Sequence, residues 1–374
     1  MVGQQSTSSS NAPSRRARNQ VAAIAVILGI AYMAIASKGN ITKLFYTGTN
    51  SPLPLEIEKH TSRVNDATGF DGQFYHVIAH DPLLQKGYER YVDNPSMRWR
   101  RIAVPAIAAV TNPDWGFLAI QIVCAFIGVW LVSAFAGQPY IGLSFLAIPS
   151  VAVSIDRMTI DLPLATATIA FAFLQRGRAI YPVLAVAPLI RETGILLTAG
   201  WCLWNAKEKR WREVLAGAAT AIPTLAWWAY VAKHTPPDGT KWLAAYPFSG
   251  LVERLQAGFP WPTSLWLKAA TITEALGLAG VLLAIACVAY LMAKRRTGLL
   301  EITAVLFLAF MSMIGKYDVW DGVYSYGRTL SPLLALLLLL AIRDRKPVYA
   351  IPILLMLPRI ALQYEAQLAL AFRT

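Results

Sequence analysis

The sequence predicts an all-α protein, a polytopic transmembrane helical bundle of about 10–11 helices with a long first external loop that carries short amphipathic helices. Hydrophobic residues make up 56% of the 374 residues and charged residues only 15%, against roughly 25% charged residues in soluble domains. Long apolar runs recur from residue 20 to the end. Lysine and arginine gather in alternate segments between these runs, which is the pattern of basic cytoplasmic loops.

The N-terminal region predicts a tail, an anchor and a long loop. Residues 1–19 are rich in Ser and Asn and end in three arginines, so we expect a disordered cytoplasmic tail. Residues 20–374 then form a single transmembrane domain. The apolar run at 21–36 has no small-residue cleavage site after it, which favours a retained membrane anchor. The polar segment 38–101 follows, outside the cytoplasm by the charge rule.

The rest of the chain predicts further membrane helices. Two runs, 181–190 and 194–204, are shorter than the roughly 20 residues of a full crossing. They favour a hairpin of short helices that enters from the cytoplasm and returns, with Arg191 and Glu192 at its tip. A second external segment, 233–268, is rich in Pro, Trp and Lys, and we expect it to cover the active site together with 38–101. The full spans are expected at 115–136, 140–154, 159–175, 213–232, 270–293, 300–314, 325–342 and 348–363.

Charge and cysteine content exclude several classes of function. Part of the net charge of +13 reflects topology. The basic residues are scattered between spans without a soluble basic domain, so we expect no nucleic-acid partner. The three cysteines, Cys124, Cys202 and Cys287, lie far apart inside apolar runs, without disulfide or metal spacing.

Residues 69–82 are the most chemically varied stretch of the chain. Gly69 and Gly72 flank Asp71, so the backbone can turn tightly and present that carboxylate. Apolar residues then recur at spacings of three and four, which predicts a short amphipathic helix lying on an apolar surface. We expect Asp71 to be the reacting group; the alternative is a turn or helix-cap role. Asp81 precedes Pro82 and is interpreted as a turn or helix-end residue.

The two histidines of this stretch raise the possibility of a metal. His76 and His80 are spaced i, i+4, the geometry of two ligands on one helix face. No third ligand is evident in the sequence. We therefore expect no metal, and assign His76 a supporting role in substrate binding.

The predicted topology brings many charged residues to the external membrane boundary. Lysine and arginine are normally enriched in cytoplasmic segments, so basic groups on the external side need another cause. An anionic ligand such as a lipid phosphate accounts for them. Interfacial anchoring of the arginines and a structural Arg191–Glu192 pair are the alternatives. The boundary residues are Asp71, Asp81, Arg98, Arg100, Arg101, Asp156, Arg157, Arg191, Glu192, Lys316 and Arg328.

These residues lead to a resemblance. The stretch 69–82 resembles the Asp-Gly-Gln-Phe-Tyr segment of a family of bacterial multi-span proteins linked to cell-surface glycopolymer formation. It is also similar, more loosely, to the first external loop of GT-C-type glycosyltransferases, including the mannosyltransferases of GPI-anchor synthesis with their Trp-Asp-x-x-x-Tyr pattern. The likeness continues through 93–95, 98–105, 191–193 and 324–332, but only the block 69–105 is specific. Phe70 stands where the mannosyltransferases have tryptophan, so the identity of the donor does not carry over.

The resemblance implies a GT-C-like membrane glycosyltransferase in which Asp71 is the catalytic base. Such an enzyme transfers a sugar from a polyprenyl-phosphate donor to a glycan or glycolipid acceptor in cell-envelope glycopolymer synthesis. It needs no cofactor, and its partners are these substrates and membrane lipids. The resemblance also implies the bacterial cytoplasmic (inner) membrane, with the N-terminus inside and the active site on the periplasmic side. The expected substrate-binding residues are Gln73, Tyr75, His76, Arg98, Arg100, Arg101, Arg191, Glu192, Lys316 and Arg328.

Two other functions are compatible with the residues. A transporter or flippase of lipid-linked glycans accounts for a basic cavity, but not for a Gly-flanked aspartate in an external loop. A non-catalytic scaffold of a polymer-assembly complex is the other alternative.

Overall fold

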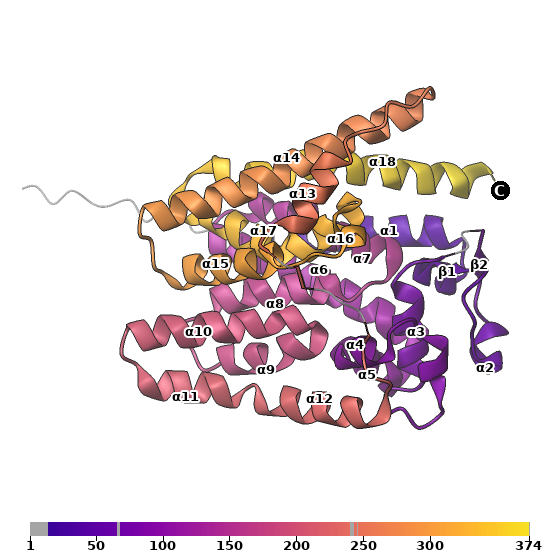
Figure 1. The fold of residues 1–374 in the computed structure, drawn as a ribbon, viewed down its shortest axis with the longest axis horizontal. Coiled ribbons are helices and arrows are strands. Elements are labelled where there is room, and N and C mark those ends of the chain that lie inside the picture. The colour runs from indigo at the N-terminus through magenta and orange to yellow at the C-terminus, as the bar shows by residue number, and fades with distance from the viewer. Residues whose placement is uncertain (1–13, 66–67, 240–242, 245, 374) are drawn as a thin grey trace, which may run out of the picture.

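The fold is an α-helical bundle, in agreement with the sequence prediction (Figure 1). It is seen in a computed structural model that describes residues 14–65, 68–239, 243–244 and 246–373. In these residues six helices are long and apolar enough to cross a membrane, or seven if one bent pair counts as a span. The chain is therefore an integral membrane protein. The six candidate spans are Arg15–Ser37, Pro113–Ala136, Trp211–His234, Leu265–Ala293, Val323–Asp344 and Pro347–Ala369.

The long apolar helices lie where the hydrophobic runs predict them. Four are α1 (Arg15–Ser37), α6 (Pro113–Ala136), α14 (Leu265–Ala293) and α17 (Val323–Asp344). Two more are built from consecutive pieces: α11 (Trp211–Ala219) with α12 (Ile222–His234), and the 3₁₀ helix η5 (Pro347–Ala350) with α18 (Ile351–Arg373). Shorter helices fill the remaining predicted positions: α8 (Asp161–Phe173), α9 (Ile180–Ile190), α10 (Ile195–Lys207) and α15 (Leu299–Ser312).

Two predictions need correction. The expected disordered tail is helical from Arg15 on, because α1 begins there with Ser14 as its N-cap; residues 1–13 lie outside the described part of the chain. The expected straight span at 140–154 is instead a 3₁₀ helix, η3 (Pro139–Ala147), followed by α7 (Pro149–Arg157), with a bend of 68° between them. Proline favours an extended conformation of the residue before it, and Ile148 has one.

The central helix of the bundle is α17. The apolar stretch with which this helix could cross a membrane is 83% buried inside the protein. The helix contacts α7, α8, α14 and α15. The run from Leu333 to Leu340 is buried throughout, which explains why this helix is apolar on all sides. Arg328 and Thr329 lie in the first half of this rigid helix.

Segment 38–101 gathers at one end of the bundle, where α18 also ends (Figure 1). It folds into short elements joined by a two-stranded parallel sheet. The tip of the α9–α10 hairpin is a 3₁₀ turn, η4 (Glu192–Gly194). The other short elements are η1 (Ile41–Phe45), β1 (Thr47–Gly48), α2 (Leu55–Glu58), β2 (Arg63–Val64), α3 (Gly72–His80), η2 (Tyr88–Tyr91), α4 (Pro95–Arg100), α5 (Ala103–Thr111), α13 (Ser249–Gln256) and α16 (Tyr317–Trp320).

The helix predicted after Asp71 is α3, and its surroundings differ from the expectation. The spacing of apolar residues predicted one face on an apolar surface. In the structure nearly all of α3 is buried, because α5, α6, η1 and η2 contact it from several sides. Only Phe74 and His80 of this helix are half-buried. The helix is therefore an internal support of this end of the bundle.

Candidate functional site

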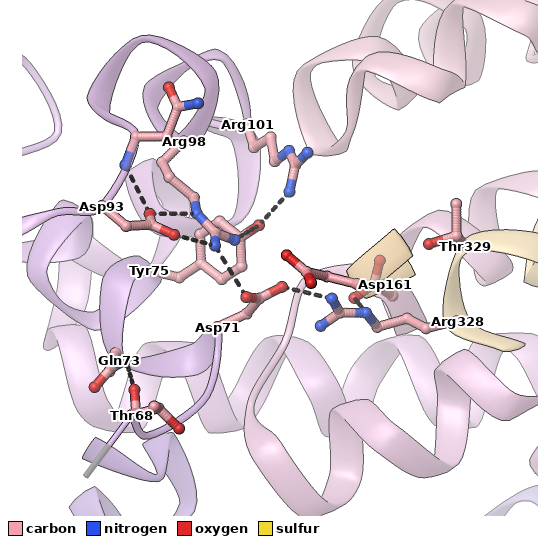
Figure 2. Close-up of polar contacts among 12 residues, drawn as sticks. Thr68, Asp71, Gln73, Tyr75, Asp93, Arg98, Arg101, Asp161, Arg328 and Thr329 are labelled. Atoms are coloured by element: carbon pink, nitrogen blue, oxygen red, sulfur yellow. Dashed lines mark hydrogen bonds and ion pairs between the residues drawn. The ribbon is translucent and has the colours of Figure 1, made fainter. Parts of the chain in front are cut away.

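Asp71 lies in a tight turn that both neighbouring glycines make possible. Gly69 has a φ of +65°, a conformation that other residues rarely adopt. Gly72 lies so close to other backbone that an added Cβ would come within 2.2 Å of the Arg157 carbonyl oxygen. The turn is held from the N-terminal side, where the Phe70 N–H donates to the Tyr46 carbonyl at 3.0 Å. Asp71 thus enters α3 with its carboxylate fixed in direction (Figure 2).

The Asp71 carboxylate bridges two arginines from distant elements (Figure 2). Arg98 of α4 donates to Oδ1 at 3.0 Å, and Arg328 of α17 donates to Oδ2 at 2.6 Å. The Asp71 side chain is 21% exposed. Burial alone would raise the pKa of this carboxyl, but the charges of Arg328 and Arg98 outweigh it and hold the pKa well below its usual range. Asp71 is therefore ionised at neutral pH.

A second group of contacts joins Tyr75 of α3 to the hairpin tip. Its hydroxyl accepts hydrogen bonds from Arg101 at 2.8 Å and from Arg98 at 3.4 Å. Arg101 also donates through Nε to both oxygens of Glu192, at 2.9 and 3.1 Å. Burial lowers the pKa of Arg101, but the charge of Glu192 outweighs it and leaves that pKa above its usual value. The predicted proximity of 71–75, 98–101 and 191–192 is present in the structure.

The third group lies between the hairpin and α17. Arg191 forms an ion pair with Asp161 at the start of α8, and donates to the Thr329 hydroxyl at 3.3 Å. Arg328 Nε lies 3.5 Å from the other oxygen of Asp161. Asp161 therefore links the arginine of the hairpin tip to the arginine that also holds Asp71.

The charge balance of this site differs from the sequence expectation. A cavity whose charges are mainly basic was expected around Asp71. Instead Arg98, Arg101, Arg191 and Arg328 each have a carboxylate partner, and Arg98 has a second in Asp93, with contacts of 2.8 and 2.9 Å. The carboxylates come from four separate segments, so only the tertiary fold brings them to the arginines. We call this set the arginine–carboxylate site: Arg98, Arg101, Arg191 and Arg328 with Asp71, Asp93, Asp161 and Glu192.

Two polar cavities border the arginine–carboxylate site. One, of about 220 Å³, is lined by Arg101, Arg191 and Glu192 and by Leu243 of the second predicted external segment. The other, of about 230 Å³, is lined by Phe70, directly before Asp71. Its polar lining includes two arginines and a tyrosine. These are Arg157, Tyr324 and Arg359. Asp71 itself lines neither cavity; Phe70, its neighbour in the chain, lies at the wall of the second one, with its ring against the Arg328 guanidinium.

An apolar groove of about 810 Å³ runs between α1, α7 and α18. Its lining includes Leu28, Ile155 and Leu368, together with Tyr32. The Tyr32 hydroxyl donates to Asp156, which also accepts a hydrogen bond of 3.2 Å from Tyr324. Since Tyr324 lines the Phe70 cavity, this chain of hydrogen bonds links the wall of the groove to the wall of that cavity.

Other predicted residues take different positions. Gln73 holds the turn, accepting from the Gly48 N–H at 3.1 Å and donating to the Thr68 carbonyl at 2.9 Å. Arg100 lines the cavity of about 220 Å³ beside Arg101 and lies over the Trp228 ring. Lys316 pairs with Asp318 at 3.2 Å, outside the arginine–carboxylate site. Asp81 accepts backbone hydrogen bonds from residues 85, 86 and 88, in agreement with the predicted turn or helix-end role.

His76 faces away from the arginines. Its Nε2 lies 2.6 Å from an oxygen of Asp114, and its ring stacks on Phe45 with centroids 4.2 Å apart. His80, one turn later, lies against His76. Burial and the neighbouring His76 lower the pKa of His80 to about 4. Asp114 is the third potential ligand that the sequence did not reveal.

Sequence reasoning missed three acidic residues as functional candidates: Asp93, Asp114 and Asp161. Asp161 opens an apolar run, and a carboxylate at such a position is costly unless it has a partner. That signal was available in the sequence. Asp93 and Asp114 lie in polar turns, where an aspartate is ordinary, so only the fold reveals their partners.

The comparisons with known proteins leave the site to be interpreted from its geometry. No family model, curated protein or solved structure matches this chain.

Proposed function

We propose that this protein is a GT-C-type membrane glycosyltransferase that uses a polyprenyl-phosphate-linked sugar. The observation that carries the proposal is Asp71: a carboxylate that is fixed in a tight turn, bridges Arg98 and Arg328, and directly follows the Phe70 that lines a cavity. The reaction needs one base and cations for a departing phosphate, and this site contains both. The resemblance of residues 69–105 to glycosyltransferase external loops supports the same reaction.

In the proposed reaction an acceptor hydroxyl attacks the anomeric carbon of the donor sugar. A new bond forms between the acceptor oxygen and that carbon, while the bond between the carbon and the phosphate oxygen breaks. The hydroxyl proton passes to Asp71, and the polyprenyl phosphate departs with the bonding electron pair. A positioned base contributes typically about 10²–10⁴-fold to such a rate.

The ion pairs give the donor phosphate a second role. While Arg98 and Arg328 hold Asp71, its low pKa makes it a weak base. A bound phosphate competes for the same guanidinium groups, and Arg328 Nη1 is a buried donor without a hydrogen-bond partner among the described residues. Withdrawal of either arginine toward the phosphate raises the pKa of Asp71. Donor binding therefore activates the base.

The groove and the Phe70 cavity suit an amphiphilic donor. The apolar groove between α1, α7 and α18 accepts the polyprenyl chain, and hydrogen bonds through Asp156 link Tyr32 at its wall to Tyr324 at the wall of the Phe70 cavity. Arg157 and Arg359 line that cavity, where they can hold a phosphate on its way to Asp71. We place this reaction on the external face of the bacterial cytoplasmic membrane, with the N-terminus in the cytoplasm. The basic segments at 176–178, 207–212 and 294–296 are then cytoplasmic.

The decisive experiment compares two carboxylates that each bridge two arginines. Asp71→Asn preserves the size of the side chain but removes the base. The matched control is Glu301→Gln, because Glu301 bridges Arg296 and Arg343 in a separate cluster. Purified variants in nanodiscs are assayed for transfer from a set of polyprenyl-phosphate sugars to glycan acceptors. We expect a loss of about 10²–10⁴-fold in kcat for Asp71→Asn and activity near wild type for Glu301→Gln.

The same assay separates the alternatives. Undiminished transfer by Asp71→Asn overturns the base assignment. If the wild-type protein transfers no sugar but moves the lipid-linked sugar between leaflets, the protein is a transporter. The apolar groove joined to a polar cavity favours that function as the second candidate.

A further inference from the structure

The side of α3 that faces away from the arginines contains a separate cluster of potential metal ligands. His76 and His80 lie one helical turn apart, and Asp114 approaches them from the first turn of α6. One ligand atom from each residue lies within 4.8 Å of the others. Asn112 caps α6 by accepting from the N–H groups of residues 114 and 115, so the backbone of Asp114 is fixed.

Two imidazole nitrogens of this cluster, one in each ring, lack a hydrogen-bond partner among the described residues. His76 is 1% exposed, and its Nδ1 has no partner among the described residues. The same holds for Nε2 of His80. Buried polar atoms without partners are rare because each costs desolvation free energy. An ion coordinated by Nε2 of His80 removes the desolvation cost of that atom.

We propose that His76, His80 and Asp114 bind a divalent transition-metal ion, zinc in the first place. Two imidazoles and one carboxylate are a donor set that favours zinc over magnesium or calcium. Ligand atoms about 2.0–2.1 Å from a tetrahedral zinc ion are separated by about 3.3 Å. The 2.6 Å contact between His76 and Asp114 therefore opens slightly to admit the ion. Water completes the coordination.

The ion would serve a structural purpose. The ring of His76 already stacks on the buried Phe45, which fixes the plane of its nitrogen lone pair. A metal shared by His76, His80 and Asp114 ties α3 to α6, and α3 begins directly after Asp71. Metal binding thus fixes the helix that follows the proposed base, without touching that base. The site stands independently of the glycosyltransferase proposal.

The experiment measures zinc itself. The full-length protein in detergent is freed of metal with a chelator, dialysed against Zn²⁺ and then against buffer, and its metal content is determined by mass spectrometry. We expect one Zn²⁺ per wild-type chain and a loss to background in His80→Ala and Asp114→Asn. The matched control is His234→Ala, because His234 is an exposed histidine that stacks on Tyr230 in α12, outside this cluster. It should keep one Zn²⁺ per chain.

Two further readouts keep the proposal falsifiable if a variant folds poorly. Wild-type protein loaded with Co²⁺ should show the visible absorption bands of a four-coordinate ion, and these should disappear when Zn²⁺ is added. Zn²⁺ should also raise the Tm of the metal-free wild-type protein and of His234→Ala. Substoichiometric zinc in the wild-type protein overturns the proposal. So does full zinc content in folded His80→Ala.

Discussion

Two clusters of arginine–carboxylate ion pairs among the described residues differ in a way that shows what marks a site. The first is the arginine–carboxylate site. The second, which we call the α15 cluster, consists of Arg296, Glu301, Arg343 and Asp344. In each, two carboxylates bridge pairs of arginines: Asp71 and Asp161 in the first, and Asp344 and Glu301, the latter only 3% exposed, in the second. Ion pairing alone therefore does not distinguish them.

The surroundings of the two clusters differ. In the α15 cluster the arginine side chains are 32% and 35% exposed, so water screens their charges. This cluster joins the ends of α14, α15 and α17, which is sufficient reason for its existence. In the arginine–carboxylate site the arginines are more buried, at 7% to 11% exposure. Arg101 and Arg191 line a cavity, and Nη1 of Arg328 has no hydrogen-bond partner among the described residues. The buried environment of the arginine–carboxylate site is therefore costly in desolvation free energy when no ligand is bound.

The largest expected difference between the clusters is kinetic. Arg328→Ala removes a cation that holds both Asp71 and, in the proposed mechanism, the departing phosphate. We expect kcat/KM for sugar transfer to fall by about 10²–10³-fold, the usual effect of removing one donor to a developing negative charge. Arg343→Ala in the α15 cluster should change kcat/KM by less than about threefold, because it touches no substrate.

Steady-state kinetics of both variants in nanodiscs, with gel filtration to verify folding, provide the measurement. Arg328→Lys is the additional control. Lysine keeps the positive charge but lacks the planar guanidinium group, which can donate two hydrogen bonds to one phosphate. Equal losses in Arg328→Ala and Arg343→Ala would show that the arginines act only through stability, and the proposed distinction between the clusters would fail.

The sequence predicted the helices better than it predicted the clusters. Apolar runs mark the spans because a buried or lipid-facing helix needs them wherever it packs, so every predicted span corresponds to a helix or helix pair. The bend before Pro149 was missed because Ile148 lies inside an otherwise continuous apolar run. The burial of α3 was missed because a periodic pattern reveals one apolar face and does not show what covers the others.

The arginines of the site were predictable, and so were Asp71 and Glu192, but which carboxylate pairs with which arginine was not. Arg98, Arg101, Arg191 and Arg328 are cations on the side that the sequence predicts to be external, where the charge rule disfavours them, and that signal selected them. A carboxylate partner such as Asp161 is 30 residues from Arg191 and further from Arg328. Pairing over such separations depends on helix packing. For the same reason Asp114 could not be assigned as a ligand for His76 from spacing alone.

A smaller effect should appear in the pH dependence of stability. The pKa of Asp71 lies below that of an unfolded aspartate, about 3.9. Its ionised form therefore contributes stability that is complete above about pH 4 and is lost as the pH falls toward the folded pKa. We expect wild type to exceed Asp71→Asn in Tm by a constant amount between pH 5 and pH 7, and this margin to shrink below about pH 4.

Thermal unfolding of both proteins in detergent across that pH range gives the measurement. Taking the difference between them cancels the titration of other carboxylates that both proteins share. A margin that is unchanged down to pH 2.5, or that grows as the pH falls, would contradict the assigned ion pairs of Asp71.

The smallest expected effect concerns Lys316, which the sequence grouped with the substrate-binding cations. The structure places it at the start of α16, paired with Asp318, whose side chain is 75% exposed. Such surface pairs contribute about 0–1 kcal/mol. Lys316→Ala should therefore leave kcat/KM within about twofold of wild type and the Tm nearly unchanged. The same transfer assay decides this, with Arg328→Ala as the positive comparison. A loss comparable to that of Arg328→Ala would mean that the loop at 315–322 moves toward the cavities when substrate binds, and that the arginine–carboxylate site is incomplete without it.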